Sequence, residues 1–180
     1  EEFCERGDHW IGHVKTLDQE LIHVPLIIKL PGENKNRIIT EYVGLIDLMP
    51  TIINYAGLRI PGEYKCAGEV LDILAEGNLK SKPIISETKF KSDVQSVIWK
   101  GWKLIYYPEM KLKNLFNLKD DPAESKNIIA ENGGVLKELE TILQQWNESI
   151  LKAKKAQEKP RPVNFREEEV ENLRALGYLQ

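Results

Sequence analysis

The sequence predicts an α/β segment that contributes part of a larger sheet, followed by a small α+β domain. Three patterns along the 180 residues predict this architecture. A short, continuous apolar run at 26–30 is typical of a strand buried on both faces, and a helical pattern follows it at 47–56. Further along, β-rich runs at 94–99 and 102–107 precede an amphipathic helix at 135–156. A meander of strands followed by one helix makes a small α+β module, with the helix packed across one face of the sheet.

The first predicted strand covers 26–30, after a polar stretch at 1–20 that we expect to form a loop. Pro25 has no backbone N–H, so it belongs at the start or the edge of a strand. Pro31 and Gly32 end the apolar run. A continuous apolar run favours a strand of a parallel sheet, because such strands are covered on both faces.

The next predicted element is a helix from about Asp47 to Ala56. The carboxylate of Asp47 suits an N-cap and the positive end of a helix. Pro50 is tolerated because it falls in the first turn, and Gly57 ends the helix as its C′ residue. Five apolar residues share one face at helical spacing: Leu48, Met49, Ile52, Ile53 and Ala56.

The small domain begins after glycine-containing connecting structure at 57–82. A strand is expected within 82–89. Lys100-Gly101 is expected to be the two-residue turn of a hairpin. Residues 114–118 are expected to add a third antiparallel strand after this hairpin, and a short terminal helix is expected at 167–176.

Composition and charge exclude several classes of function. With 42% hydrophobic and 29% charged residues, the chain is typical of soluble globular proteins. The formal net charge of −3 gives no electrostatic support for nucleic-acid binding. No apolar run approaches the roughly 18 residues that a membrane-spanning helix needs. Cys4 and Cys66 lack metal-binding spacing. One disulfide between them is an open alternative, but we interpret them as unpaired thiols, which favours a reducing, cytoplasmic compartment.

All three histidines, His9, His13 and His23, lie near the start of the chain. His9 and His13 are four residues apart, but the intervening Gly12 and the lack of a neighbouring Glu argue against a zinc site. The alternative is anion recognition by His13 and Lys15, which could hold an oxyanion or stabilise charge on a leaving oxygen. An imidazolium can also donate a proton to that oxygen. His23 is interpreted as a structural or surface imidazole.

Two further features have ordinary structural interpretations. The cluster at 120–124, Asp-Asp-Pro-Ala-Glu, could bind calcium, but it lacks the alternating ligand spacing and bidentate Glu of a calcium loop. An Asp-Pro turn that caps a short helix is the better interpretation. Trp99 and Trp102 flank the predicted hairpin and are interpreted as packing residues.

The opening stretch combines Glu1-Glu2-Phe3, Gly12-His13 and a run from Glu20 to Gly32. Four further segments follow in order: Val43 to Thr51 with Ala56-Gly57-Leu58, Trp99 to Ile105, Leu115 to Asn127, and Leu173 to Tyr178. In this order and spacing, the segments closely resemble the type I sulfatases of the alkaline phosphatase superfamily. The resemblance spans nearly the whole chain, and the ordered combination is more specific than any single motif.

The resemblance implies an enzyme that hydrolyses sulfate esters on an alkaline-phosphatase-like α/β sheet. Such enzymes use a formylglycine, made from the Cys or Ser of a Cys/Ser-x-Pro/Ala-x-Arg motif, and one divalent ion, usually calcium, held by carboxylates. Cys4 is followed by Glu5-Arg6 and Cys66 by Ala67-Gly68, so neither cysteine begins that motif. The family's metal-binding Asp-His pair precedes Gly-Glu-Glu-Phe, which places it upstream of Glu1. We therefore expect no catalytic nucleophile and no metal ligand in this chain.

The same resemblance assigns the substrate contacts. His13 falls where the family keeps a His or Lys that contacts the sulfate. Many relatives have Gly at the next position, where this chain has Val14, so Lys15 is the second candidate for the contact. The chain also has Asp18-Gln19 where relatives often carry Tyr-Glu, which leaves the substrate subclass open.

These expectations define organisation and partners. Residues 1–80 form the C-terminal part of the sulfatase catalytic α/β domain, 81–158 the small α+β domain, and 159–180 a basic connector with a terminal helix. The expected partners are the N-terminal part of the same polypeptide and a sulfate ester substrate, with calcium bound only by upstream residues. The fragment alone should be inactive. Two alternatives stay open: a phosphonate or phosphodiester hydrolase of the same superfamily, which 7–10 resembles, and a non-catalytic pseudoenzyme or binding module.

Overall fold

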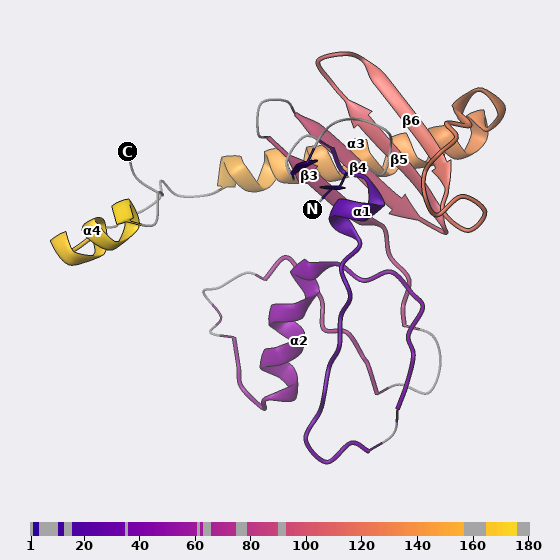
Figure 1. Cartoon of the computed structure of the whole chain (residues 1–180). Helices are drawn as coiled ribbons and strands as arrows, with labels where there is room; N and C mark the ends of the chain where they lie inside the picture. Colours follow the sequence, from indigo (N-terminus) through magenta and orange to yellow (C-terminus); the bar gives the residue numbers. More distant parts are fainter. Residues whose placement is uncertain are drawn as a thin grey trace. The chain divides into compact units, whose positions relative to one another are not determined.

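In a computed structural model of the chain, the described residues are 2–3, 11–12, 16–34, 36–60, 62, 66–74, 79–89, 93–156 and 165–175. The chain divides into two compact units, Glu1–Gln145 and Trp146–Gln180. The first unit holds the sheet and the helices that frame it, and Figure 1 shows these elements coloured along the sequence.

The first unit is organised around a four-stranded antiparallel sheet with the strand order β3-β4-β5-β6 (Figure 1). Each strand pairs with the next along the chain, which makes the sheet a meander. Its strands are β3 (Ile84–Thr88), β4 (Val94–Trp99), β5 (Trp102–Tyr107) and β6 (Leu112–Asn117). The strands predicted at 82–89, 94–99 and 102–107 are confirmed. The strand predicted at 114–118 begins at Leu112 instead.

The hairpin between β4 and β5 turns at Lys100-Gly101, as predicted. The φ angles of these two residues are 52° and 80°, and a type I′ turn requires positive values at both positions. Gly101 adopts this conformation without steric penalty because it has no Cβ. Trp99 and Trp102 pair across the turn, which fixes the register of the hairpin.

One face of the sheet packs against residues 133–145 of α3 (Gly133–Ala156), the part of this predicted long helix that lies in the first unit. Three fully buried residues lie in register across β4, β5 and β6: Val97, Leu104 and Leu115. Side chains alternate along each strand, so these three share a face. Leu139 and Leu143 of α3 are buried as well. Lys113 of β6, which shares that face, pairs with Glu140 of α3 at 2.6 Å. The helix therefore covers this face, as the α+β pattern predicts.

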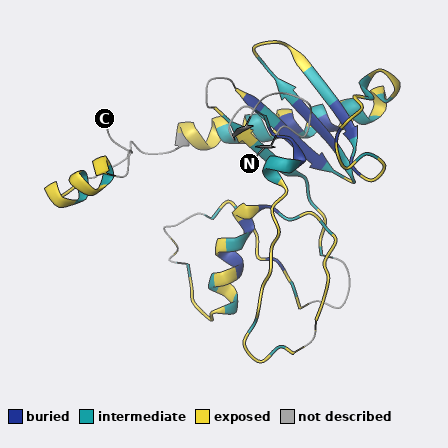
Figure 2. Cartoon of the chain, viewed as in Figure 1, coloured by how far each residue is buried: buried dark blue, intermediate teal, exposed yellow. Residues whose placement is uncertain are grey.

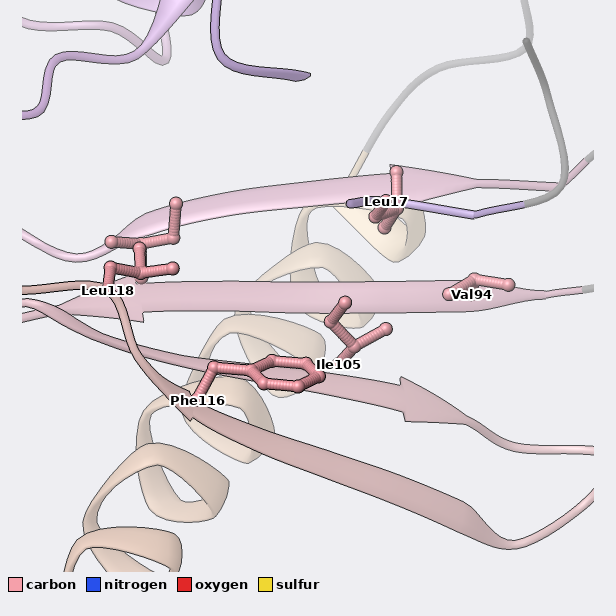
Figure 3. Packing of buried hydrophobic residues seen from close by; sticks show 6 residues of the cluster. Leu17, Val94, Ile105, Phe116 and Leu118 are labelled. Atoms are coloured by element: carbon pink, nitrogen blue, oxygen red, sulfur yellow. The ribbon is translucent and has the colours of Figure 1, made fainter. Parts of the chain in front are cut away.

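The opposite face carries the main apolar cluster, which Figure 3 shows from close by. Its buried members are Leu17, Val94, Ile98, Ile105, Phe116 and Leu118. Leu17 is the member that comes from outside the small domain, and it is only 5% exposed. Burial of a Leu side chain is worth about 1.5–3 kcal/mol. The segment that contains Leu17 and α1 (Gln19–Ile22) is thus held on the sheet.

The predicted helix at 47–56 is present as a short 3-10 turn, η1 (Leu45–Asp47), followed by α2 (Leu48–Tyr55). Gly57 ends it with a φ of 69°. Its N–H donates to the carbonyl of Asn54, and the N–H of Leu58 donates to the carbonyl of Ile53. These two bonds make a Schellman motif, so the predicted C′ role of Gly57 is confirmed.

The predicted apolar face of α2 is exposed in this chain. Met49 and Ile52 are more than half exposed, while Pro50 and Thr51 are the buried residues of the helix. Figure 2 shows that buried residues are concentrated on the sheet, whereas most of the described residues of 24–58 are exposed or half-buried.

The strand predicted at 26–30 is not formed as a strand. Among the described residues, the sheets are the β1–β2 pair and the β3–β6 meander, and 26–30 belongs to neither. Ile27 is 93% exposed, although the sequence pattern is typical of a buried strand. The physical reason is that a strand needs a neighbour to pair its backbone N–H and C=O groups, and a two-sided apolar run needs two covering layers.

The loop prediction for 1–20 is wrong at three places. β1 (Glu2–Phe3) pairs antiparallel with β2 (Ile11–Gly12), and α1 begins at Gln19. A two-residue ladder is made by backbone groups alone and is too short to leave a period-two pattern in the sequence.

Within the second unit, α4 (Glu167–Ala175) corresponds to the terminal helix predicted at 167–176. Arg166 precedes it, and its backbone N–H and guanidinium both donate to the carboxylate of Glu169. None of the helices in the described part of the chain combines the length and apolar character required to cross a membrane.

Candidate functional site

The two predicted substrate contacts, His13 and Lys15, lie outside the described residues, as does His9. The structure describes the chain continuously from Thr16 to residue 34. His23 is exposed, and its ring centroid lies 6.0 Å from that of Tyr42. This agrees with the interpretation of His23 as a surface imidazole.

A buried ion pair lies where the segment after Lys15 meets the sheet. Lys103 Nζ lies 2.5 Å from a carboxylate oxygen of Glu124, and neither side chain has exposed surface. Lys103 belongs to β5, on the face that carries Ile105, and Glu124 follows β6. Taking two charges out of water costs free energy that close pairing offsets only when further hydrogen bonds are present.

Gln19 provides such hydrogen bonds. Its backbone N–H donates to the second oxygen of Glu124 at 2.7 Å, and its side-chain Oε1 accepts from Lys103 Nζ at 3.4 Å. Asp18 and Gln19 are both buried, next to Leu17 in the apolar cluster. The start of α1 is therefore joined to the sheet by apolar packing on one side and by a buried charge pair on the other.

Tyr42 brings a further segment of chain close to this pair. Partial burial raises the pKa of the Tyr42 phenol, and the negative charge of Glu124 raises that pKa further. Both effects favour the neutral phenol, because each disfavours a phenolate. Tyr42 is thus a neutral side chain near neutral pH and is no candidate for a general base.

The turn that presents Glu124 is the Asp-Pro turn predicted at 120–124. The carboxylate of Asp121 accepts hydrogen bonds from the backbone N–H groups of Ser125 and Lys126 and from the Ser125 hydroxyl. Glu124 takes a φ of 54°, in the left-handed region that favours glycine. Across the described part of the chain, no group of three His, Cys, Asp or Glu residues is placed to hold a metal ion. The hydrogen bonds of Asp121 confirm the predicted turn, but no helix begins at 124–128 for it to cap.

Asp47 forms a second buried polar junction. It occupies the predicted N-cap position of α2, but its carboxylate makes no hydrogen bond to the start of the helix. Instead, Oδ1 accepts from Lys82 Nζ at 2.6 Å and from the backbone N–H of Glu69 at 2.9 Å. Thr51 Oγ1 donates to the Asp47 carbonyl and accepts from the N–H of Leu71. These bonds tie α2 to 66–74 and to Lys82, so the carboxylate serves tertiary structure rather than helix capping.

Gly68 is required for this second junction. A Cβ at Gly68 would lie 2.0 Å from the backbone oxygen of Ile46, a distance that no side chain can occupy. Asp47 Oδ2 is buried and has no hydrogen-bond partner in the described residues. The close backbone approach at Gly68 lets Glu69 reach the Asp47 carboxylate.

Sequence reasoning missed the ion pair of Lys103 and Glu124, although a signal was present. Lys103 stands between Trp102 and Leu104 in a β-rich run, where alternation places it on the same face as Ile105. A lysine on the inner face of a two-sided sheet must be buried with a partner, since an unpaired buried ammonium is very costly.

The meander β3–β6, with α3 on one face and the apolar cluster of Leu17 on the other, is a small α+β domain. The sequence model of the family "N-sulphoglucosamine sulphohydrolase, C-terminal" matches residues 7–155. The chain belongs to this family.

Curated relatives of the chain are sulfatases. The Delta 4,5-hexuronate-2-O-sulfatase of Bacteroides thetaiotaomicron is 28% identical over 127 residues, which cover 64% of this chain and 26% of that protein. Arylsulfatase K of Bos taurus is 30% identical over 121 residues, which cover 61% of this chain and 22% of that protein. The chain therefore spans about a quarter of the length of the curated relatives it matches.

Solved structures confirm the fold class. A 2-O GAG sulfatase matches with a TM-score of 0.50 and 24% identity, over 64% of this chain and 27% of that chain. Ps i-CgsB in complex with k-i-k-neocarrahexaose matches with a TM-score of 0.52 and 19% identity, over 79% of this chain and 30% of that chain. At these identities the likeness concerns the fold, and it agrees with the predicted α/β segment followed by a small α+β domain.

Proposed function

We propose that this chain is the C-terminal part of a sulfatase that hydrolyses sulfate esters. The observation that carries the proposal is the family match over residues 7–155, together with relatives that are themselves sulfatases. The chain supplies the end of the catalytic α/β domain, a substrate-facing loop and the small C-terminal domain. Of these, the substrate-facing loop takes part in the reaction directly.

In this proposal His13 contacts the sulfate, with Lys15 as the second candidate. A cationic or hydrogen-bonding side chain stabilises the negative charge that develops on sulfate oxygens in the transition state. A protonated His13 can also donate its proton to the leaving oxygen. These roles need no nucleophile from the same segment, since they act on the charge and on the leaving group.

The formylglycine nucleophile and a calcium ion are proposed to belong to the rest of the protein. The ion would supply electrostatic stabilisation of the sulfate oxygens. Three described carboxylates already have other partners: Asp47 Oδ1 accepts from Lys82 and a backbone N–H, Asp121 accepts from turn donors, and Glu124 pairs with Lys103. No step of the reaction is assigned to a metal held by these residues.

The exposed apolar surface of 24–58 supports a partner within the same polypeptide. Its large exposed residues are Val24, Leu26, Ile27, Ile28, Ile38, Ile39, Tyr42, Leu45, Ile46, Met49, Ile52 and Leu58. A soluble protein rarely exposes so many apolar side chains along one segment unless another surface covers them. We propose that the missing part of the α/β domain packs on this segment, where the run at 26–30 would pair as a strand.

The test is a parallel assay of the complete protein that carries these residues. We expect it to release sulfate from aryl sulfates or sulfated sugars faster than it releases phosphate from matched phosphate esters. Faster phosphate release would favour the phosphonate or phosphodiester alternative. Release of neither would favour a non-catalytic binding module. The 180-residue chain alone is the control and should release no sulfate.

A further inference from the structure

Lys103 and Glu124 form a buried ion pair on a face of the sheet that is otherwise packed with apolar side chains. Both side chains have no exposed surface. Apolar residues of similar volume would fill the same space without desolvating two charges, and such replacements are often neutral or stabilising. Buried polar groups retained at such a cost can instead fix one arrangement of the surrounding chain. The arrangement that this pair fixes is the position of α1.

Glu124 joins the turn after β6 to α1 through its side chain. Its φ of 54° is close to the values at Lys100 and Lys111, so the contacts of the carboxylate, and not its backbone, distinguish this residue. The carboxylate accepts from the N–H of Gln19 at 2.7 Å, across 105 positions of sequence.

The anchored residue lies close in sequence to the predicted sulfate contacts. Gln19 is four positions after Lys15 and six after His13. Leu17, Asp18 and Gln19, which follow these positions closely in sequence, are buried against the sheet. The bond to Gln19 therefore holds the described end of the segment that leads to the predicted contacts.

We propose that Lys103 and Glu124 are positioning residues of the sulfatase reaction, which hold the substrate-facing loop in place through Gln19. The inference rests on the proposed sulfatase function and extends it to two residues far from the loop in sequence. Neither side chain touches the substrate. They reduce the number of positions that the sulfate-contacting side chains can adopt. Less conformational entropy is then lost when the ester binds, so binding is tighter.

Two double variants of the complete protein separate positioning from simple stability. Lys103→Met/Glu124→Gln removes both charges but keeps an amide oxygen that can accept from the Gln19 N–H. Lys103→Met/Glu124→Leu removes both charges and the acceptor. We expect the first variant to keep a KM for the sulfate ester near that of the parent protein. We expect the second to raise KM about tenfold, with a smaller change in kcat.

Two further measurements accompany the kinetics. Circular dichroism and thermal unfolding select variants that are folded, so that loss of structure cannot imitate loss of positioning. Hydrogen exchange of the amides of Gln19–Ile22 should be faster in the Leu variant than in the Gln variant. Glu138→Gln, which removes an exposed partner of Lys100 and Trp99 on the opposite side of the sheet, is the matched control and should leave KM unchanged.

Equal KM values and equal exchange in two folded double variants would overturn the proposal, because a purely structural pair predicts that result. A parent protein that cleaves no sulfate ester would instead contradict the proposed function. In that case the exchange measurement still decides whether Glu124 holds Gln19 in place.

Discussion

Replacement of Glu124 by Gln tests whether the pair with Lys103 is buried and paired as the structure has it. The substitution keeps the shape of the side chain and an oxygen that can accept from the N–H of Gln19. It removes the negative charge that lies 2.5 Å from Lys103 Nζ. The ammonium of Lys103 then keeps the Gln19 oxygen as an acceptor but loses its negatively charged partner at a site without exposed surface.

The expected loss of stability follows from this burial. Removing one partner of a buried ion pair costs about 3–5 kcal/mol, whereas an exposed pair is worth about 0–1 kcal/mol. Neither Lys103 nor Glu124 has exposed surface, so the larger cost, that of a buried pair, applies to them. Small domains have unfolding free energies of about 5–15 kcal/mol, so Glu124→Gln should remove a large fraction of the total. With a urea m value of about 2 kcal/mol/M, a loss of 4 kcal/mol lowers the midpoint by about 2 M.

The assay is urea unfolding of the chain followed by tryptophan fluorescence, since Trp99 and Trp102 lie in the sheet. Lys103→Met/Glu124→Gln should recover most of the lost stability, because no unpaired charge remains. A loss below about 1 kcal/mol for Glu124→Gln would refute the reasoning, as it is the value of a solvent-exposed pair.

Three further predictions concern other parts of the molecule. Gly68→Ala should destabilise the chain by more than about 2 kcal/mol in the same urea assay, because its Cβ would lie 2.0 Å from the carbonyl oxygen of Ile46. The phenol of Tyr42 should ionise at a higher pH than a free tyrosine, and in Glu124→Gln it should ionise at a lower pH than in the parent chain. The titration is followed by ultraviolet absorbance, and the part of the signal that is lost in Tyr42→Phe belongs to Tyr42. Glu138→Gln should change stability little near neutral pH, since its ion pair is exposed, and should reduce the loss of stability on acidification.

The sign of each pH effect follows from the direction of the pKa shift. The side-chain hydrogen bond from Lys100 lowers the pKa of Glu138, with a smaller contribution from Trp99, so its stabilisation is present above the unfolded pKa and is lost as pH falls through the folded pKa. Burial raises the pKa of Tyr42, so its contribution to stability is present below the unfolded pKa and is lost as pH rises through the folded pKa.

A Tyr42 titration that does not move in Glu124→Gln would contradict the placement of Glu124 near the phenol. Unchanged stability of Gly68→Ala would contradict the close approach to Ile46.

The hairpin and the two main helices could be predicted because their signals are local. Lys100-Gly101 determines the turn by the φ angles that it accepts, and Gly57 ends α2 through hydrogen bonds within a few residues. The apolar stripe of α3 likewise repeats at helical spacing within one segment. Each of these elements is specified by neighbours in sequence.

The remaining features depend on contacts between distant residues. The run at 26–30 has the pattern of a buried strand, but it forms no sheet because none of the described residues provides a strand to pair with it. Asp47 has the pattern of an N-cap, yet Lys82 and Glu69 compete for its carboxylate from elsewhere in the chain. Position in sequence alone does not reveal such partners.

The candidate site likewise contains residues that the sequence predicts and residues that it does not. His13 and Lys15 were assigned by resemblance to the sulfatases, and they remain predictions because they lie outside the described residues. The pair of Lys103 and Glu124 was missed because lysine and glutamate are usually exposed. Its burial depends on Gln19, which approaches from the other end of the first unit.

Sulfate release by the complete protein that carries this chain is the decisive measurement of the proposed function. We expect hydrolysis of sulfate esters that falls sharply when His13 is replaced by Ala, while the fold, measured by circular dichroism, is retained. We also expect a much slower release of phosphate from matched phosphate esters. A folded complete protein that releases no sulfate from aryl sulfates or sulfated sugars would contradict the proposed function.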